Sequence, residues 1–400
     1  MDNSISNSFL KILIIIYLLT LTVAGQYNSQ ISYADFFSVF FLIYIFFNLK
    51  FLKKNFLFIT VILIFYTILI GLFSLIAEKN TPFILFVMAI KMINFMIILT
   101  FGYLCSQLIV RTRHIYIPFI TLIIFLYFVI NLYLGEKTYY GYVGLPSINS
   151  PSNAGISLAS VTIFGLIMFF FDSKKFSYKS ITNLSIFILF ILTLLVQTRA
   201  TFYSLTIVLT FLIFYYIFFI NKIYYKKLFS ILIVVFLLLI FLININLFVE
   251  FFPRIKISNL VYNFEYRFNK AQVFYSEMCE ALTCSFFGTG MGSHAFYNGK
   301  IALSIDNLFS KLRIEWGILG SFLWLIYFLN LTIISSFEYK SKGKTVKLIL
   351  PTFIFLLFGS LIGFSSEFIF VSYSGSYYGF FLGALYGYFF KKEKGIVYQN

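Results

Sequence analysis

The side chains best suited to chemistry gather in one polar stretch, residues 251–317. This stretch interrupts a chain that is otherwise apolar enough to sit in lipid. It combines carboxylates, such as Asp306 and Glu315, with guanidinium groups, such as Arg267 and Arg313. Carboxylates can act as general bases, and arginines bind anions through paired hydrogen bonds. If the protein catalyses a reaction, we expect it here.

A run of glycines in the same stretch is a second candidate element. The segment FFGTGMGSH places Gly288, Gly290 and Gly292 at alternate positions, two residues before His294. Such a run lets backbone amides approach an anion closely, although many tight turns have the same pattern. It does not join a strand to a helix in a βαβ unit, so the sequence does not support a dinucleotide site.

The next segment, IDNLFSKLRIEWGILGSF, predicts an amphipathic helix that continues into an apolar span. On a helix, Asp306, Ser310 and Arg313 fall near one face, because they are spaced by four and three residues. We expect that face to present an acid and an arginine together toward a cavity.

Arg199 stands between two apolar runs, in VQTRATFYS. An arginine at the edge of the hydrocarbon is a functional candidate by default, and the alternative is an anchor that snorkels to water. Gln197, Thr198 and Thr201 favour a polar pocket around it. The segment PSNAG, which includes Asn153, is either a structural turn or a functional loop.

Lys91 and Glu367 are ionisable residues inside predicted spans. Lys91 lies near the middle of its span and could pair with Glu367 or line an anionic cavity. A structural ion pair and a ligand contact are equally compatible with the sequence.

The three cysteines predict no metal site, because one histidine and two cysteines in the polar stretch fall short of a zinc ligand set. Cys105 lies in an apolar run and is expected to be a packing residue. Cys279 and Cys284 share a loop that could be oxidising, but two free thiols are the prediction that we favour.

Composition places the chain among helical membrane proteins. Its 400 residues are 61% hydrophobic and 11% charged, far from the values of a soluble domain. The net charge of +16 is scattered between apolar runs and forms no continuous basic face, so nucleic-acid binding is not expected. About twelve runs are long enough to span a membrane: 9–24, 31–49, 55–76, 82–109, 115–134, 153–171, 181–197, 201–220, 228–250, 314–335, 348–370 and 374–390.

Lysine and arginine placement predicts the orientation. With both termini in the cytoplasm, most basic residues fall in the inner loops, as the positive-inside rule requires. We therefore expect one membrane domain over residues 1–400, in which residues 251–313 form a long outer loop with the amphipathic helix and the site. The first apolar run reads as a retained span, because it lacks a convincing cleavage site.

Four of these segments together resemble the O-antigen polymerase and O-antigen ligase superfamily, the polytopic glycosyltransferases of bacterial surface polysaccharide assembly. They are PSNAG, QTRATFYS, the FFGTGMG run after Arg267, and IDNLFSKLRIEWGILG, in which Asp306 and Asn307 match a conserved family pair. The likeness covers residues 145–325. Asp306 stands where the ligases have a histidine, which favours a polymerase.

The resemblance implies an all-α, GT-C-like enzyme of the bacterial inner membrane with its active site on the periplasmic face. It implies transfer of a glycan from polyprenyl (undecaprenyl) diphosphate to the non-reducing end of another lipid-linked repeat unit, as in lipopolysaccharide or capsule synthesis. The expected partners are these lipid-linked oligosaccharides, membrane lipid and a chain-length regulator, and no metal or other cofactor is expected.

That reaction assigns roles to the candidate residues. Arginines would offset the charge of the departing diphosphate, and a carboxylate would take the proton of the acceptor hydroxyl. Asp306 is the first choice for the base and Glu315 the second. The expected diphosphate-binding residues are Arg199, Arg267, Arg313 and Arg254. The alternatives are an O-antigen ligase that transfers glycan to the lipid A core and a flippase or transporter, which would need more polar residues at the membrane midplane.

Overall fold

The structure is a computed structural model, and in the residues that it describes the regular secondary structure is helical apart from one short hairpin. It describes residues 3–23, 33–76, 82–134, 151–171, 179–196, 198–219, 265–266, 269, 272, 282–289, 296–297, 300–301, 308–331, 345–363 and 372–393. The hairpin pairs β1 (Phe296–Tyr297) with β2 (Lys300–Ile301) in antiparallel register.

The helices follow the apolar runs of the sequence. They are α1 (Asn3–Val23), η1 (Tyr33–Phe36), α2 (Phe37–Phe47), η2 (Leu49–Phe51), α3 (Lys54–Ile76), α4 (Pro82–Leu104), α5 (Ser106–Leu134), α6 (Pro151–Phe171), α7 (Lys179–Leu195), α8 (Arg199–Phe219), α12 (Leu282–Phe287), α13 (Leu308–Leu329), α15 (Thr345–Gly363) and α16 (Ser372–Glu393).

Four of these helices, α3, α5, α6 and α13, are long and apolar enough to cross a membrane, and six others are apolar but shorter in their described part. Large apolar side chains on α2 and α3, including Phe46, Phe47 and Phe58, are mostly exposed. Such a surface suits lipid better than water. The fold is therefore that of a helical, multi-pass membrane protein. The count of twelve spans and the GT-C-like arrangement stay predictions, and the span at 228–250 lies outside the described residues.

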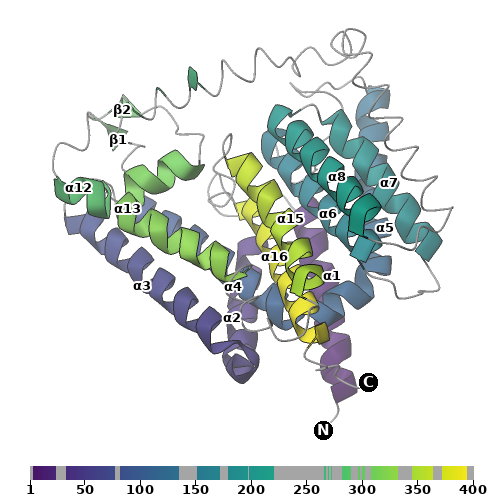
Figure 1. The fold of residues 1–400 in the computed structure, drawn as a ribbon, viewed down its shortest axis with the longest axis horizontal. Helices are drawn as coiled ribbons and strands as arrows, with labels where there is room; N and C mark the ends of the chain where they lie inside the picture. Colours follow the sequence, from purple (N-terminus) through teal and green to yellow (C-terminus); the bar gives the residue numbers. More distant parts are fainter. Residues whose placement is uncertain are drawn as a thin grey trace.

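The core is organised around α16. All residues of α16 from 374 to 389 are buried, and Figure 1 shows α15 and α16 between α13 on one side and α5 to α8 on the other. Glycines at every fourth position let α16 approach α4 closely: a Cβ on Gly383 would collide with the carbonyl of Leu99, and one on Gly387 with the carbonyl of Tyr103. Small residues at this spacing are typical of close helix pairs in membranes.

One predicted boundary is wrong. The sequence predicts a loop at residues 110–114, between spans 82–109 and 115–134, but the chain turns at Cys105 and α5 begins at Ser106. Backbone hydrogen bonds from Cys105 to Phe101 and from Ile109 to Cys105, both 2.9 Å, continue the helical pattern through the turn. Arg111 and Arg113, which fall between the two predicted spans, therefore lie inside α5.

Candidate functional site

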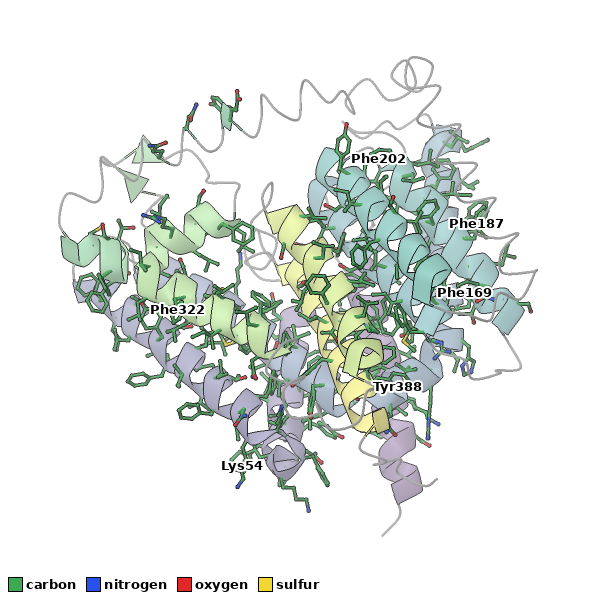
Figure 2. The ribbon with its side chains drawn as sticks, viewed as in Figure 1. Lys54, Phe169, Phe187, Phe202, Phe322 and Tyr388 are labelled. Atoms are coloured by element: carbon green, nitrogen blue, oxygen red, sulfur yellow. The ribbon has the colours of Figure 1, made fainter. Side chains whose placement is uncertain are left out.

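The first turns of three helices, α6, α8 and α16, meet at one end of the bundle. Pro151 opens α6, a position that suits proline because its missing N–H needs no partner there. The hydroxyl of Ser374, in the first turn of α16, lies 3.5 Å from Oδ1 of Asn153 and donates to it. Figure 2 shows Phe202, in the first turn of α8, at the same end. We call Asn153, Gly155, Thr198, Thr201 and Ser374 the rim cluster.

The contact between α6 and α8 joins two segments that the sequence singled out, PSNAG and QTRATFYS. A Cβ built on Gly155 would lie 2.6 Å from Oγ1 of Thr198 and 3.0 Å from Oγ1 of Thr201. Both threonine hydroxyls therefore point at the backbone of Gly155. A residue with a side chain at this position would collide with them. Thr198 and Thr201, two of the predicted polar neighbours of Arg199, therefore face Gly155 of α6.

These two hydroxyls are unusual for buried polar groups. Thr198 is 7% exposed and Thr201 1% exposed, and neither Oγ1 has a hydrogen-bond partner within the described part of the chain. Thr198 occupies the N-cap position of α8, because its carbonyl accepts the bond from Phe202 N at 2.9 Å. An N-cap threonine normally bonds an amide of the first turn, but this one faces α6 instead. Leaving a buried hydroxyl unpaired costs about 1–3 kcal/mol.

Arg199 is the first residue of α8, so its backbone stands at the rim cluster. Helix N-termini carry a partial positive charge and amides without a partner in their own helix. The rim cluster therefore combines three helix N-termini, two buried hydroxyls and the start of an arginine-bearing helix. This combination favours a ligand that is anionic and rich in acceptor oxygens.

A second structured region lies where α12 meets α13, and two glycines hold it together. Gly288 has φ of 83° and Gly317 has φ of 67°, conformations that disfavour other residues. A Cβ on Gly288 would collide with the carbonyl oxygen of Glu315, and one on Gly317 with Phe286 O and Gly288 N. We call this backbone contact the glycine clasp. It joins FFGTG to EWG, two motifs that are far apart in the sequence.

Hydrogen bonds fix the clasp on the side of α13. Gly317 breaks the helical geometry of α13 with ψ of −170°. The carbonyl of Ile314 accepts bonds from the backbone N–H of Thr289 at 2.7 Å and from its hydroxyl at 2.9 Å. On the other side, the hydroxyl of Tyr66 in α3 donates to the carbonyl of Trp316 at 2.9 Å. The kink is therefore held by groups from two other elements.

One prediction about this region stays open and one is corrected. The amide of Gly288 donates to the carbonyl of Cys284 at 2.7 Å, while Gly290 and Gly292 lie outside the described residues, so anion or glycan binding by the glycine run stays a prediction. Cys284 is disulfide-bonded, whereas Cys105 is buried and its sulfur is not part of a disulfide. The preference for two free thiols in the loop is therefore wrong for Cys284. The remaining cysteine of the sequence, Cys279, lies outside the described residues.

The buried face of α13 carries residues other than Asp306, Ser310 and Arg313, whose shared face stays a prediction because Asp306 lies outside the described residues. Lys311 and Glu315 are completely or almost completely buried, at 1% and 0% exposure, and they lie one turn apart on the same face. Arg313 is exposed and Ser310 is half-buried. Glu315 is therefore the acidic residue on the buried face of α13, and Lys311 is the basic residue on the same face. Sequence reasoning missed Lys311, although its spacing of four from Glu315 was visible.

The helix α15 lies between the two regions. Its last residue is Gly363. A Cβ built on Gly363 would lie 3.2–3.4 Å from side-chain atoms of Leu308 and Phe309 at the start of α13. On its other side α15 packs against α6 and α8. The rim cluster and the first turn of α13 are therefore neighbours of the same helix.

The remaining candidates can be placed only in part. Lys91 is the tenth residue of α4 and is half-buried. Eight predicted site residues lie outside the described residues: Arg254, Arg267, Gly290, Gly292, His294, Asp306, Asn307 and Glu367.

Comparison of the chain with known protein families finds no family model that matches it, and no curated protein matches it either. The superfamily resemblance therefore rests on the four motifs alone.

Proposed function

We propose that this chain is a membrane glycosyltransferase that builds polysaccharide from lipid-linked repeat units. It would transfer a glycan from polyprenyl diphosphate to the non-reducing end of a second lipid-linked unit. The observation that carries this proposal is the contact of α6 with α8, where the hydroxyls of Thr198 and Thr201 face Gly155 beside the start of the arginine-bearing helix. Both segments belong to the motifs that resemble the O-antigen polymerase and ligase superfamily.

The rim cluster suits a diphosphate because of its charge and its donors. Three helix N-termini favour negative charge, each by about 0.3–1 kcal/mol when exposed and more when shielded. The hydroxyls of Thr198 and Thr201 can donate to phosphate oxygens, which would remove the cost of burying them unpaired. Arg199 would add a guanidinium group with a fixed fork of donors. The proposal gives these groups one task, stabilising the charge that grows on the leaving diphosphate.

The transfer step follows from the chemistry of a glycosyl diphosphate. The oxygen of the acceptor hydroxyl forms a bond to the anomeric carbon of the donor. The bond from that carbon to the diphosphate oxygen breaks, and the diphosphate leaves with the electron pair. The hydroxyl proton passes to a carboxylate. Asp306 remains the first choice for this base, and Glu315, on the buried face of α13, remains the second.

The cellular setting completes the proposal. The chain would lie in the bacterial inner membrane with both termini in the cytoplasm and the rim cluster at the periplasmic face. A lipid-linked substrate explains why the site stands at the end of apolar helices, because its polyprenyl tail stays in the bilayer. A GT-C-like arrangement and a chain-length regulator as partner belong to the same proposal.

Inactivation of the gene tests this proposal against the ligase alternative. A polymerase mutant should lose the ladder of polysaccharide chain lengths and keep a single repeat unit on its acceptor. Loss of all attached glycan would show a ligase instead. A normal ladder of chain lengths and normal attachment of the glycan in the mutant would refute both.

A further inference from the structure

Aromatic contacts show that α13 runs antiparallel to α3. The ring centroids of Phe56 and Tyr327 lie 6.0 Å apart, and those of Tyr66 and Trp316 lie 5.8 Å apart. Residue numbers therefore rise along α3 in the direction in which they fall along α13. This alignment places each position of α13 along the length of α3.

The glycine clasp lies within the length of α3. A Cβ built on Gly320 would lie 2.8 Å from Cε1 of Tyr66, so these two residues share one level. Residues 67–76 of α3 follow Tyr66 and extend about 15 Å. Gly317 precedes Gly320 by three residues, or about 5 Å of helix, so about 10 Å of α3 extends beyond the clasp. Because α3 is long and apolar enough to cross a membrane, the clasp lies at the level of the hydrocarbon.

Exposed apolar side chains surround the clasp. Phe286 and Phe287, the last residues of α12, are 50% and 44% exposed. The carbonyl oxygen of Phe286 is the atom nearest to a Cβ built on Gly317, so α12 touches α13 here. Ile318, the next residue of α13, is 45% exposed, and Phe322, one turn further, is 54% exposed. The exposed apolar faces of α12 and α13 therefore adjoin each other at the clasp.

Hydrogen bonds within the protein satisfy the irregular backbone at the end of α12. At the depth of the hydrocarbon, backbone outside a helix is tolerated only where it is buried in protein or lines a water-filled cavity. Gly288 and Thr289, which follow α12, are both buried. Their amides donate to the carbonyls of Cys284 and Ile314, both at 2.7 Å. This backbone therefore meets the requirement for a segment that enters lipid.

We propose that α12 inserts into the leaflet at the Ile76 end of α3, where Phe286 and Phe287 contact the acyl chains of the bilayer lipids. The occupant is lipid because this apolar surface lies near the lipid-facing surface of α3, on which Phe65 is 66% exposed. Within the polar stretch 251–317, α12 is thereby an anchor in the membrane. This inference goes beyond the proposed function and does not rest on it, because it requires only that α3 crosses the bilayer.

Spin labels on α12 test this contact. A cysteine is introduced by Phe286→Cys or Phe287→Cys into the Cys105→Ala chain, and reductant is left out so that the disulfide of Cys284 persists. In nanodiscs, collisions of the label with oxygen, which is more soluble in lipid, are compared with its collisions with a water-soluble nickel complex. Both labels should collide more with oxygen than with the nickel complex.

Two reference positions calibrate the measurement. Phe65→Cys is the lipid reference, and Lys50→Cys is the water reference, because Lys50 is an exposed basic residue in η2. A label at Phe286 or Phe287 that prefers the nickel complex, as at Lys50, while the label at Phe65 prefers oxygen, would overturn the inference. Either α12 variant carries the test by itself if the other fails to fold.

Discussion

Replacing Thr198 and Thr201 by valine tests whether their buried hydroxyls exist for a ligand. Valine keeps the branched shape of threonine and replaces the hydroxyl by a methyl group. Because neither Oγ1 has a partner within the described residues, the substitutions should remove an unfavourable burial of about 1–3 kcal/mol without breaking a hydrogen bond. Each variant should therefore be as stable as wild type or more so. Polysaccharide synthesis should nevertheless fall by tenfold or more, since each lost donor to a phosphate oxygen corresponds to about 1.5–3 kcal/mol.

A matched control lies in the same helix bundle. Thr162 of α6 is completely buried, but its hydroxyl donates to Leu158 O at 2.8 Å and lies 3.1 Å from Oγ1 of Thr193. Thr162→Val should lower stability by about 1 kcal/mol, which shifts the unfolding midpoint by about 1–3 °C in a protein of this size. Its activity per folded molecule should not change.

The assay pairs thermal unfolding of the purified variants with the ladder of polysaccharide chain lengths in cells that produce equal amounts of each protein. The reasoning is refuted if Thr198→Val and Thr201→Val lose stability as Thr162→Val does and keep a normal ladder. That result would make the two hydroxyls structural.

Two further predictions concern the region around α12. Gly288→Ala and Gly317→Ala should each destabilise the protein by about 1–3 kcal/mol and reduce its amount in membranes, because both glycines have positive φ and face backbone atoms. The control, Gly363→Ala, should be tolerated because its Cβ would meet only side-chain atoms at 3.2 Å or more. Equal yields of all three variants would contradict the glycine clasp. Maleimide labelling of the unfolded, unreduced chain should modify only Cys105 in wild type, since Cys284 is disulfide-bonded. In Cys284→Ser one additional thiol should be labelled. Labelling of all three cysteines in wild type would contradict the disulfide.

Much of the fold was predictable because apolar length decides where membrane helices form. The predicted spans at 153–171, 181–197 and 201–220 match α6, α7 and α8 to within two residues at each end. The turn at Cys105 was not predictable in this way. Arg111 and Arg113 fall between the predicted spans 82–109 and 115–134, but both lie inside α5, and Arg113 bonds the carbonyl of Val110 in the same helix at 3.0 Å. Only Ser106 and Gln107 follow Cys105 as polar residues, which is too short a polar stretch to predict a turn from composition.

The candidate site was predictable in its residues more than in its contacts. The polar neighbours of Arg199 were recognised, and Thr198 and Thr201 are indeed buried together. Their contact with Gly155 depends on how α6 packs on α8, which local sequence does not contain. For α13, Lys311 and Glu315 occupy the buried face, whereas Arg313 is exposed and Ser310 half-buried. Asp306 lies outside the described residues, so the face that combines it with Arg313 stays a prediction.

The most direct test of the proposed function uses purified protein in nanodiscs with a polyprenyl-diphosphate-linked repeat unit as donor and acceptor. We predict a ladder of glycans on a gel and release of polyprenyl diphosphate, both strongly reduced in Thr198→Val. If the folded protein leaves the repeat unit unchanged, the assignment of the rim cluster to a departing diphosphate is contradicted.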